Sequence, residues 1–381
     1  MSWQAQLKAI NWLPAVFALA LTVFGVAFVI SACYDPDAAL GLGPEAKKQI
    51  VWFVIGLAAC TSVALVPLTF WRQAAVPSYV ACLVVQGLMI AAAGSSLVPR
   101  VKGAHNWLVL GPLTIQPSEF IKLGVLLCCA RAVASSGFDV RRLSHLAGVL
   151  AIAAVPALLL AREDLGSALT FPPLAIGMLF LAGMRPAHLA GLAAATVTVI
   201  GAGVLMLPKE GPKAYQYHRI QAWWDPDRYR LTEAYQTTQA MHSIGSGQWT
   251  GAGYLEGNLN RLGWLPEKHT DLIFAVVGEE SGFLGSTFAL LLFLGFGCAG
   301  VACAAASRDA FARALIGGFS CLIMGQAMIN LAVVLGLMPV TGITLPFISY
   351  GGSSLLGSWL GVGLVLSATA ARGQRDSVQW R

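Results

Sequence analysis

Ten apolar runs, each long enough for a membrane-spanning helix, make up most of this 381-residue chain. They cover residues 11–33, 49–68, 76–94, 117–134, 145–161, 165–183, 187–207, 272–306, 311–337 and 350–371. A helix needs about 20 apolar residues to cross a bilayer, and in lipid only helices and closed barrels satisfy every backbone hydrogen bond. The runs therefore predict an all-α, polytopic membrane protein with about ten transmembrane helices.

The charge content excludes other classes of protein. Charged residues make up 11% of the chain, whereas a soluble protein carries about 25%. The net charge of +6 is spread along the sequence instead of forming a basic cluster, so the chain is not expected to bind nucleic acid.

The distribution of basic residues predicts the orientation in the membrane. If the N-terminus lies in the cytoplasm, the inner segments hold eleven of the 24 basic residues and three of the 18 acidic ones. This bias follows the positive-inside rule. We therefore expect both termini and a short basic tail, residues 372–381, in the cytoplasm. A large polar loop, residues 208–271, then lies outside, and residues 1–381 form a single transmembrane domain.

Two ionisable residues mark the outer end of the fourth span. Pro117 suits the first turn of a helix, which places Glu119 and Lys122 three residues apart on one side. One interpretation is an ion pair with Lys122 extended toward the lipid headgroups. The other is a cation aimed at an anionic headgroup, because an ionisable residue inside a span is a functional candidate.

The start of the sixth span carries a second carboxylate, Asp164. Its side chain could cap the helix by accepting a backbone N–H. Alternatively, Asp164 belongs to a catalytic cleft, where its oxygens could bind a divalent cation.

The outer loop combines aromatic residues with amide and basic side chains. This composition, which includes Arg219, is typical of a surface that binds sugars or headgroups. Trp223 and Trp224 are better interpreted as anchors at the membrane interface. The glycines between residues 245 and 257 do not match a dinucleotide fingerprint and indicate tight turns.

The loop ends at Asp271, where the chain re-enters the membrane. If Pro266 opens a helix, Glu267 and Asp271 share one face, and two close carboxylates favour Asp271 as a base. If Thr270 caps a helix instead, Asp271 only complements the helix dipole. Other ionisable residues near the same face favour the functional interpretation: His269, Glu279 and Glu280.

A segment rich in serine and glycine, residues 339–354, precedes the tenth span. Free N–H groups at such a helix start can bind an anion. Gly351 and Gly352 would let a phosphate approach the backbone closely, with Ser349 and Ser353 beside them. A tight connection without a ligand is the alternative.

Four stretches, residues 102–122, 163–167, 265–285 and 330–354, closely resemble the SEDS proteins (shape, elongation, division and sporulation), in particular RodA. The resemblance covers nearly the whole chain. It implies a peptidoglycan glycosyltransferase that polymerises lipid II into glycan strands outside the bacterial cytoplasmic membrane. It also implies a divalent cation, Mg²⁺ or Mn²⁺, and partnership with a class B penicillin-binding protein and the membrane proteins of the elongation complex.

The resemblance assigns roles to particular residues. Asp271 matches the essential aspartate of the family, and Trp107, Lys122 and Asp164 match positions that the family uses. The family usually has Gln-Pro before this last aspartate, whereas this chain has Arg162 and Glu163. The lost proline should loosen the turn, and Glu163 adds a charge.

These observations support a mechanistic hypothesis. Asp271 acts as general base on the acceptor hydroxyl, and a single displacement inverts the anomeric centre. Lys122, Arg219, a cation and the helix start after residue 349 could stabilise the leaving pyrophosphate. The predicted substrate-binding residues are Trp107, Glu119, Lys122, Asp164, Arg219, His269, Ser349, Gly351, Gly352 and Ser353.

Two other functions compete with this hypothesis. A lipid II flippase would keep its polar groups near the bilayer midplane, where the sequence offers few: Gln86, Gln326 and Asn330. A noncatalytic scaffold for the transpeptidase would tolerate loss of Asp271. The short N-terminus and Lys268 favour elongation, and a division-type member remains the alternative.

Overall fold

The computed structural model describes residues 10–38, 41–101, 104–111, 113–161, 163–205, 214–262, 264–265 and 267–376. The helices are α2 (Leu13–Ala32), α3 (Pro44–Leu65), α4 (Leu68–Ala91), α5 (Pro117–Val133), α6 (Leu143–Leu160), α7 (Leu165–Ala168), α8 (Phe171–Leu181), α9 (Pro186–Leu205), α10 (Tyr215–Trp224), α11 (Tyr235–Ser246), α12 (Asn258–Arg261), α13 (Ile273–Ala306), α14 (Ala310–Val334) and α15 (Gly352–Asp376). Two short strands, β1 (Leu108–Leu110) and β2 (Leu113–Ile115), pair antiparallel. Parts of the predictions above lie outside the described residues: Lys102, Gly103, Arg162, Pro266, residues 208–213 of the loop and residues 377–381 of the tail.

Each predicted span coincides with a helix, and the sixth is divided into α7 and α8. The division follows from Pro172 and Pro173, which occupy the first turn of α8, where the missing N–H of proline costs nothing. Among the described residues, seven helices are long and apolar enough to cross a membrane: α2, α3, α4, α6, α13, α14 and α15 up to Ala371. The predicted all-α, polytopic membrane fold is confirmed.

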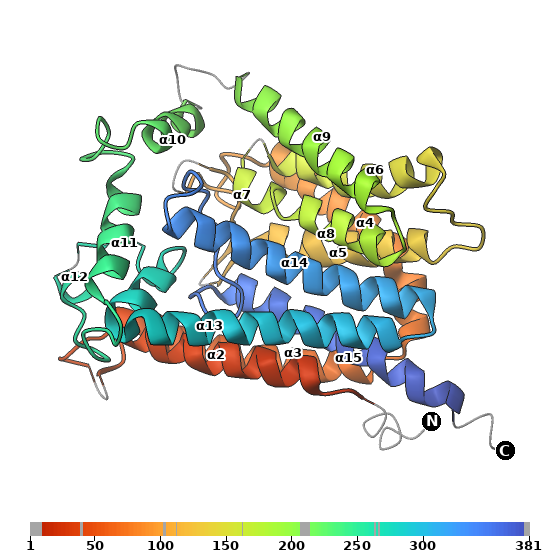
Figure 1. Cartoon of the computed structure of the whole chain (residues 1–381), viewed down its shortest axis with the longest axis horizontal. Helices are drawn as coiled ribbons and strands as arrows, with labels where there is room; N and C mark the ends of the chain where they lie inside the picture. The colour runs from red at the N-terminus through yellow and green to blue at the C-terminus, as the bar shows by residue number, and fades with distance from the viewer. Residues whose placement is uncertain are drawn as a thin grey trace.

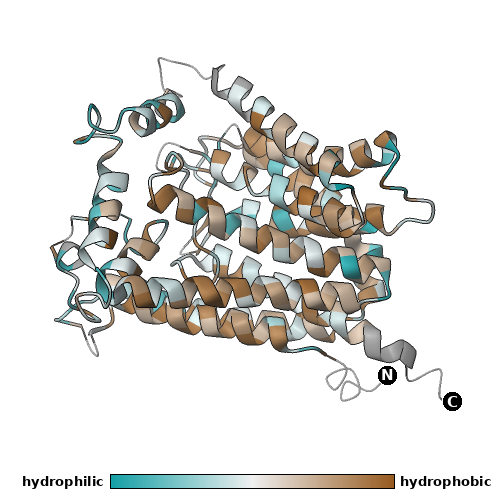
Figure 2. Ribbon diagram, in the orientation of Figure 1, coloured by the Kyte–Doolittle hydropathy of each residue, from teal (hydrophilic) through white to brown (hydrophobic). Residues whose placement is uncertain are grey.

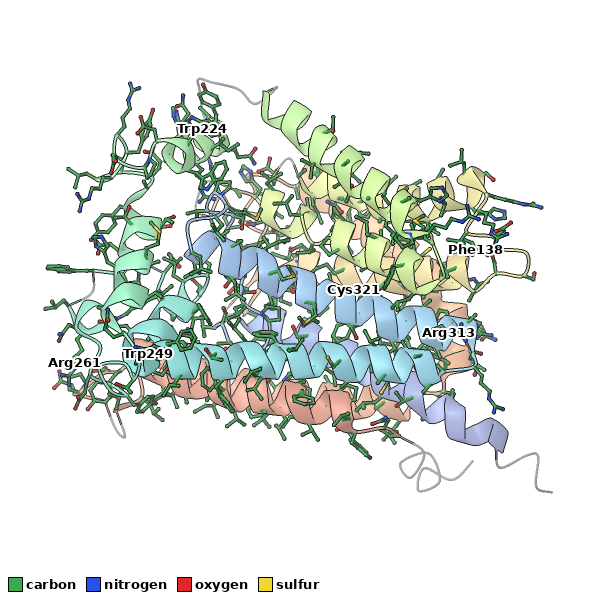
Figure 3. All side chains as sticks on the ribbon, in the orientation of Figure 1. Phe138, Trp224, Trp249, Arg261, Arg313 and Cys321 are labelled. Atoms are coloured by element: carbon green, nitrogen blue, oxygen red, sulfur yellow. The ribbon has the colours of Figure 1, made fainter. Side chains whose placement is uncertain are left out.

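The long helices form a bundle with one polar end (Figure 1). Helices α10, α11 and α12 lie at this end, which we call the loop end. The start of α2 and the end of α15 lie at the opposite end. Hydrophilic residues gather at the loop end, whereas the helices of the bundle are largely hydrophobic (Figure 2). Trp224, Trp249 and Arg261 project at the loop end, and Phe138 and Arg313 lie at the other (Figure 3).

The outer surface of the bundle is apolar. Leu88, Leu158 and Val197 on three different helices are each at least 62% exposed. In water such a surface would drive association, but in a bilayer it contacts acyl chains. The ionisable and amide side chains of α5 and α14, Glu119, Lys122, Gln326 and Asn330, are buried instead.

Helix α14 lies at the centre of the bundle, in contact with α5, α8, α13 and α15. Small residues allow these helices to approach closely. A Cβ at Gly325 of α14 would overlap the ring of Pro173 on α8. From this position α14 reaches both Lys122 and the backbone of Asp271, as described below.

Helix α13 is broken at Gly282, which has φ 60° and ψ −156°. The eighth apolar run, residues 272–306, is long for one crossing, and the sequence alone predicts that its start, residues 271–282, lies along the outer surface. The break is present, but residues 273–280 are buried beneath α11 and the loop that follows it. The backbone N–H groups of Ala252 and Gly253 donate to the carbonyls of Glu279 and Glu280 at 2.9 and 3.0 Å. The glycine-rich loop thus satisfies carbonyls that the break leaves free.

Candidate functional site

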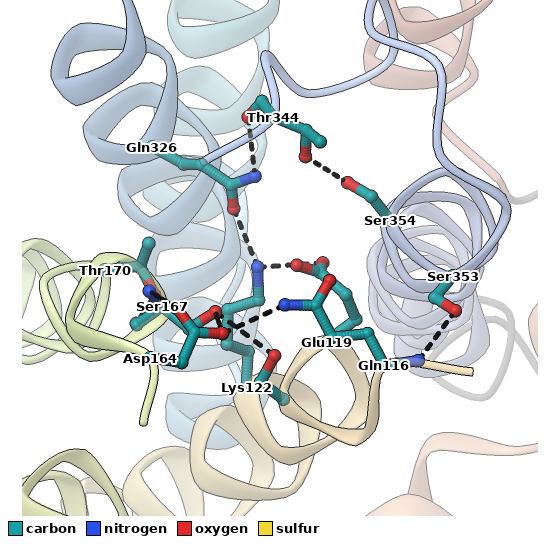
Figure 4. A network of polar contacts seen from close by, with 11 residues as sticks. Gln116, Glu119, Lys122, Asp164, Ser167, Thr170, Gln326, Thr344, Ser353 and Ser354 are labelled. Carbon is teal, nitrogen blue, oxygen red and sulfur yellow. Dashed lines mark hydrogen bonds and ion pairs between the residues drawn. The ribbon is translucent and has the colours of Figure 1, made fainter. Parts of the chain in front are cut away.

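A buried ion pair on α5 is hydrogen-bonded to α14. Lys122 is 3% exposed, and its Nζ lies 2.8 Å from Glu119 Oε2 and donates to Gln326 Oε1 at 2.8 Å (Figure 4). Burying a charge requires such partners because desolvation is expensive. The ion pair of the first interpretation is present, but Lys122 is buried in the bundle and does not extend toward the headgroups as that interpretation assumed.

Two amide side chains on α14 position the rest of the site. Gln326 Nε2 donates to the carbonyl of Thr344 at 3.0 Å. One turn later, Asn330 Nδ2 donates to the carbonyls of Ile343 at 2.7 Å and Asp271 at 2.8 Å. One face of α14 therefore holds both the backbone of Asp271 and the backbone of residues 343–344. In the sequence, the one sign of this role is that Gln326 and Asn330 are amides within an otherwise apolar span.

Asp271 lies in a turn directly before α13 and is 8% exposed. The N-cap of α13 is Leu272, without a side-chain cap, and Glu267 has a positive φ of 51°. Residues 267–271 thus form neither the helix nor the Thr270 cap considered above. The Thr270 hydroxyl nevertheless lies 3.0 Å from Glu267 Oε2 and 2.9 Å from Asp271 Oδ1. Because a hydroxyl has one proton, it can donate to one of these carboxylates at a time.

Asp164 caps α7, as one interpretation predicted. Its Oδ1 accepts from the Ser167 N–H at 2.9 Å. Its Oδ2 accepts from Ser167 Oγ at 2.7 Å, Gln116 Nε2 at 2.9 Å and Asn106 Nδ2 at 3.4 Å. The carboxylate therefore also ties α7 to the residue that precedes α5 (Figure 4).

The residue that replaces the family's proline has a partner. Glu163 Oε2 accepts from the backbone N–H of His105 at 3.2 Å and lies 3.2 Å from its Nδ1. The added charge thus holds the connection between α6 and α7 against the segment before β1.

The serines before α15 are engaged within the protein. Ser349 Oγ accepts from the Leu345 N–H at 2.7 Å. Ser353 Oγ accepts from the Gln116 N–H at 3.0 Å. An anion would have to replace these contacts, and the anion site stays a prediction.

The two glycines at the start of α15 have different environments. The Gly351 N–H donates to Gln49 Oε1 at 3.3 Å, and a Cβ there would have ordinary contacts. A Cβ at Gly352 would overlap the ring of Trp52. Close packing of α15 on α3 is therefore a sufficient reason for Gly352, without a phosphate.

Three other predicted residues lie at the loop end. Trp107 directly precedes β1 and is half-buried. Arg219 on α10 donates from Nη1 to the Val340 carbonyl at 3.3 Å. The carbonyl of His269 accepts from the Tyr350 N–H at 2.8 Å. The last two contacts attach α10 and the turn of Asp271 to residues 339–350. Beside them, burial lowers the pKa of Lys268 from its usual value.

The described residues do not by themselves form a metal site: they contain no cluster of three or more His, Cys, Asp or Glu side chains suited to a metal. Four hydrogen bonds occupy the carboxylate of Asp164, and Glu119 is paired with Lys122. These two carboxylates are engaged within the protein, and a divalent cation stays a prediction.

Comparison with known proteins identifies the family. Residues 11–374 match the family profile FTSW_RODA_SPOVE, described as cell cycle protein. The chain belongs to this family, the SEDS proteins. It is 33% identical to a probable peptidoglycan glycosyltransferase FtsW of Trichlorobacter lovleyi over 93% of this chain and 92% of that protein. It is 34% identical to the FtsW of Geobacter metallireducens, with 93% of both chains covered.

Solved structures share the fold of this SEDS protein. A chain from a structure described as "Structural coordination of polymerization and crosslinking by a peptidoglycan synthase complex" has a TM-score of 0.78 and 29% identity, with 95% of this chain and 98% of that chain covered. The RodA of Thermus thermophilus has a TM-score of 0.69 and 28% identity, with 95% and 97% covered.

Proposed function

We propose that this SEDS protein is a peptidoglycan glycosyltransferase that polymerises lipid II, with Asp271 as its general base. The main structural support is the contact of Asn330 with both Asp271 and Ile343. Through it, a nearly buried carboxylate and the Lys122 ammonium are attached to the same short segment. A base and a cation held in fixed positions are what a displacement with an anionic leaving group requires.

In this proposal the loop end faces the outside of the bacterial cytoplasmic membrane, and both termini lie in the cytoplasm. The distribution of basic residues supports this orientation. The site residues then lie at the outer ends of their helices, within reach of a lipid-linked saccharide and a growing glycan.

The Asp271 carboxylate accepts the proton of the acceptor hydroxyl, and that oxygen attacks the anomeric carbon of the donor. The bond to undecaprenyl pyrophosphate breaks, and the anomeric configuration inverts. The Thr270 hydroxyl, 2.9 Å from Asp271 Oδ1, can orient the carboxylate before attack. Glu267, which contacts the same hydroxyl, provides a second carboxylate through which the proton can leave.

Cationic groups stabilise the leaving pyrophosphate in this proposal. Lys122 and Arg219 supply fixed positive charge, and Glu119 and Gln326 keep the Lys122 ammonium in place. A divalent cation held by Asp271 and the pyrophosphate would neutralise the charge that develops there.

The decisive experiment is lipid II polymerisation by purified protein. A general base contributes typically 10²–10⁴-fold to a rate, so Asp271→Asn should lower polymer formation by at least about 100-fold. Adding a chelator to the wild type tests the proposed cation separately. Wild-type polymer formation by Asp271→Asn would overturn the proposal and favour a noncatalytic scaffold.

The same assay separates polymerisation from lipid II transport. In detergent there is no membrane to cross, so a flippase would form no glycan product. Gln326 and Asn330, the buried amides of α14, are engaged in holding backbone carbonyls, which supports an enzyme over a transporter.

The cellular role has two candidates. We propose elongation and cell shape on the resemblance to RodA, and division is the second candidate because FtsW proteins are 33–34% identical to this chain. Depletion separates them: loss of an elongation enzyme makes rod-shaped cells round, whereas loss of a division enzyme makes them filamentous.

We also propose a class B penicillin-binding protein as partner. The support is the similarity to a chain from a peptidoglycan synthase complex. Co-purification with the transpeptidases of the same cell tests this pairing and also identifies the cellular role, since elongation and division use different partners.

A further inference from the structure

Four arginines gather at the end of the bundle opposite the loop end. Arg131, in the last turn of α5, donates from Nη1 to the carbonyl of Arg72 on α4 at 2.6 Å. Arg72 Nη2 in turn contacts both oxygens of Asp309, the N-cap of α14, at 2.6 and 2.7 Å. Arg308 directly precedes this aspartate, and Arg313, labelled in Figure 3, lies one turn after it. We call these four residues the arginine cluster.

Two guanidinium groups of the cluster are held in place by backbone carbonyls. Arg313 donates from Nε and Nη2 to the Ser307 carbonyl at 3.2 and 3.0 Å, and Arg131 uses a carbonyl in the same way. A carbonyl orients a guanidinium without cancelling its charge, and each guanidinium has five N–H donors. Because Arg131 and Arg313 are both exposed, a ligand at the surface of the bundle can reach these fixed charges.

The charge of the cluster favours an anion. Its contacting carboxylate, Asp309, is engaged by Arg72 and by the N–H groups of Phe311 and Ala312. Four positive charges against this one negative charge leave three positive charges. The planar fork of a guanidinium matches the oxygens of a phosphate group, so a phosphate is the anion that the cluster suits best.

Exposed apolar side chains continue from the cluster along α4. Val76 and Val80 follow Arg72 at intervals of four residues and so lie on nearly the same side of the helix. They are 44% and 52% exposed, and Phe70 in the first turn is 53% exposed. A positive charge at the end of an exposed apolar helix face matches a phospholipid, whose phosphate and acyl chain are joined. A soluble anion or an acidic peptide would leave the apolar face unused.

We propose that the arginine cluster binds the phosphate of an anionic phospholipid, with an acyl chain along Val76 and Val80 of α4. Basic groups between membrane helices at the bilayer surface are suited to anionic headgroups. Since the cluster belongs to α4, α5 and the start of α14, the bound lipid holds three helices together at this end. The proposal does not depend on the polymerase activity. It also does not depend on the orientation, because headgroups cover both surfaces of a bilayer.

Native mass spectrometry of the full-length protein in a nonionic detergent tests the proposal. The probes are phosphatidylglycerol, phosphatidylcholine with the same acyl chains, and glycerol 3-phosphate. Phosphatidylcholine is the matched control because it has the same phosphate, whose charge its own quaternary ammonium balances. We expect phosphatidylglycerol to bind about 5-fold or more tighter than phosphatidylcholine, the effect of at least one arginine on an anionic headgroup. Glycerol 3-phosphate, which has no acyl chain, should bind more weakly than phosphatidylglycerol.

Arginine variants locate the binding. Arg131→Gln and Arg308→Gln should each weaken phosphatidylglycerol binding by about 5-fold. Arg308 is exposed and lies outside the helices, so its variant keeps the test valid if Arg131→Gln fails to fold. Arg142→Gln is the matched control: it removes the same charge from the same end of the bundle, and Arg142 is 70% exposed and pairs with Asp139. It should change binding by less than about 2-fold, because exposed charges at a distance are screened.

Each outcome supports or overturns the proposal. Tighter binding of phosphatidylglycerol that the cluster variants weaken and the control does not would support it. Equal binding of phosphatidylcholine would show that the cluster does not select an anionic lipid, and equally tight glycerol 3-phosphate would assign it to a soluble anion. An equal loss in Arg142→Gln would reduce the effect to the general charge of this end. Unchanged binding in the folded Arg131→Gln and Arg308→Gln variants would leave the cluster to another partner, such as an acidic protein segment.

Discussion

At the scale of single residues, the side chains nearest in sequence were the most predictable. The three-residue spacing of Glu119 and Lys122 offered their ion pair as one of two interpretations, and the position of Asp164 before an apolar run offered the capping role in the same way. The contact of Lys122 with Gln326 joins residues 204 positions apart. No local pattern encodes such a contact, because it follows from the packing of α5 against α14.

The buried pair leads to a prediction about Lys122. Lys122→Met leaves the Glu119 carboxylate buried without its cation, which should destabilise the fold by about 3–5 kcal/mol. Adding Glu119→Gln removes that charge and should recover most of the loss. Thermal unfolding in detergent measures both effects.

Polymerisation assays on the same two variants separate folding from catalysis. If the ammonium acts on the leaving group, the double variant folds but forms little polymer. A double variant that polymerises lipid II at the wild-type rate would assign Lys122 a structural role alone.

At the scale of helices and loops, the lengths of the apolar runs predicted the spans. The backbone contacts between distant segments could not be predicted from the sequence. The glycines of residues 245–257 indicated turns, and Gly251 and Gly253 do have positive φ values of 80° and 109°. That this loop covers the first segment of α13 could not be foreseen, since backbone hydrogen bonds carry no side-chain signature.

Two glycines of this region should respond differently to substitution. A Cβ at Gly247 would overlap the Gly278 carbonyl of α13, whereas one at Gly245 meets no atom within 4 Å. Gly247→Ala should therefore destabilise the protein by about 1–3 kcal/mol or more. Gly245→Ala, the control inside the last turn of α11, should be neutral or slightly stabilising because alanine favours helix. Equal unfolding temperatures for the two variants would contradict this contact.

The start of α14 should show a pH-dependent contribution to stability. Asp309 Oδ1 accepts from the N–H groups of Phe311 and Ala312, and both its oxygens contact Arg72 Nη2 at 2.6 and 2.7 Å. Burial alone would raise the pKa of Asp309, but these hydrogen bonds and the Arg72 charge outweigh it and lower the pKa below its usual 3.8.

A lowered pKa in the folded state stabilises the protein above the usual value, and the stabilisation is lost as the pH falls through the folded-state pKa. The difference in unfolding free energy between the wild type and Asp309→Asn should be constant near neutral pH and shrink below pH 3.8. Asp309→Ala, which also removes the cap, should cost about 1 kcal/mol more. A difference that does not change with pH would show that the ion pair contributes nothing.

At the scale of the whole molecule, the number and order of the spans were predictable because lipid leaves few alternatives to the helix. Their arrangement was not, since nothing in the sequence indicates that α14 rather than another helix occupies the centre. Likewise, the sequence did not indicate that α11 covers the first segment of α13, because this contact forms only when the bundle assembles.

The orientation of the whole molecule can be tested by labelling introduced cysteines in intact cells. Leu231 lies in the large loop and is 89% exposed, and Ser136 lies between α5 and α6 at the opposite end and is also exposed. In a background without the exposed Cys298, a membrane-impermeant maleimide should label Leu231→Cys and spare Ser136→Cys. The reverse pattern would place Asp271 in the cytoplasm and remove the basis of the proposed reaction.

The one-turn separation of Gln326 and Asn330 on α14 has a consequence for how such a protein can change over evolution. A rotation or shift of this helix would disengage both amides at once. The carboxylate and the ammonium are therefore not independently adjustable: a substitution that moves one is expected to move the other. Substitutions can accumulate on the lipid-facing surface and in the loops. The position of α14 relative to its neighbours has to be kept.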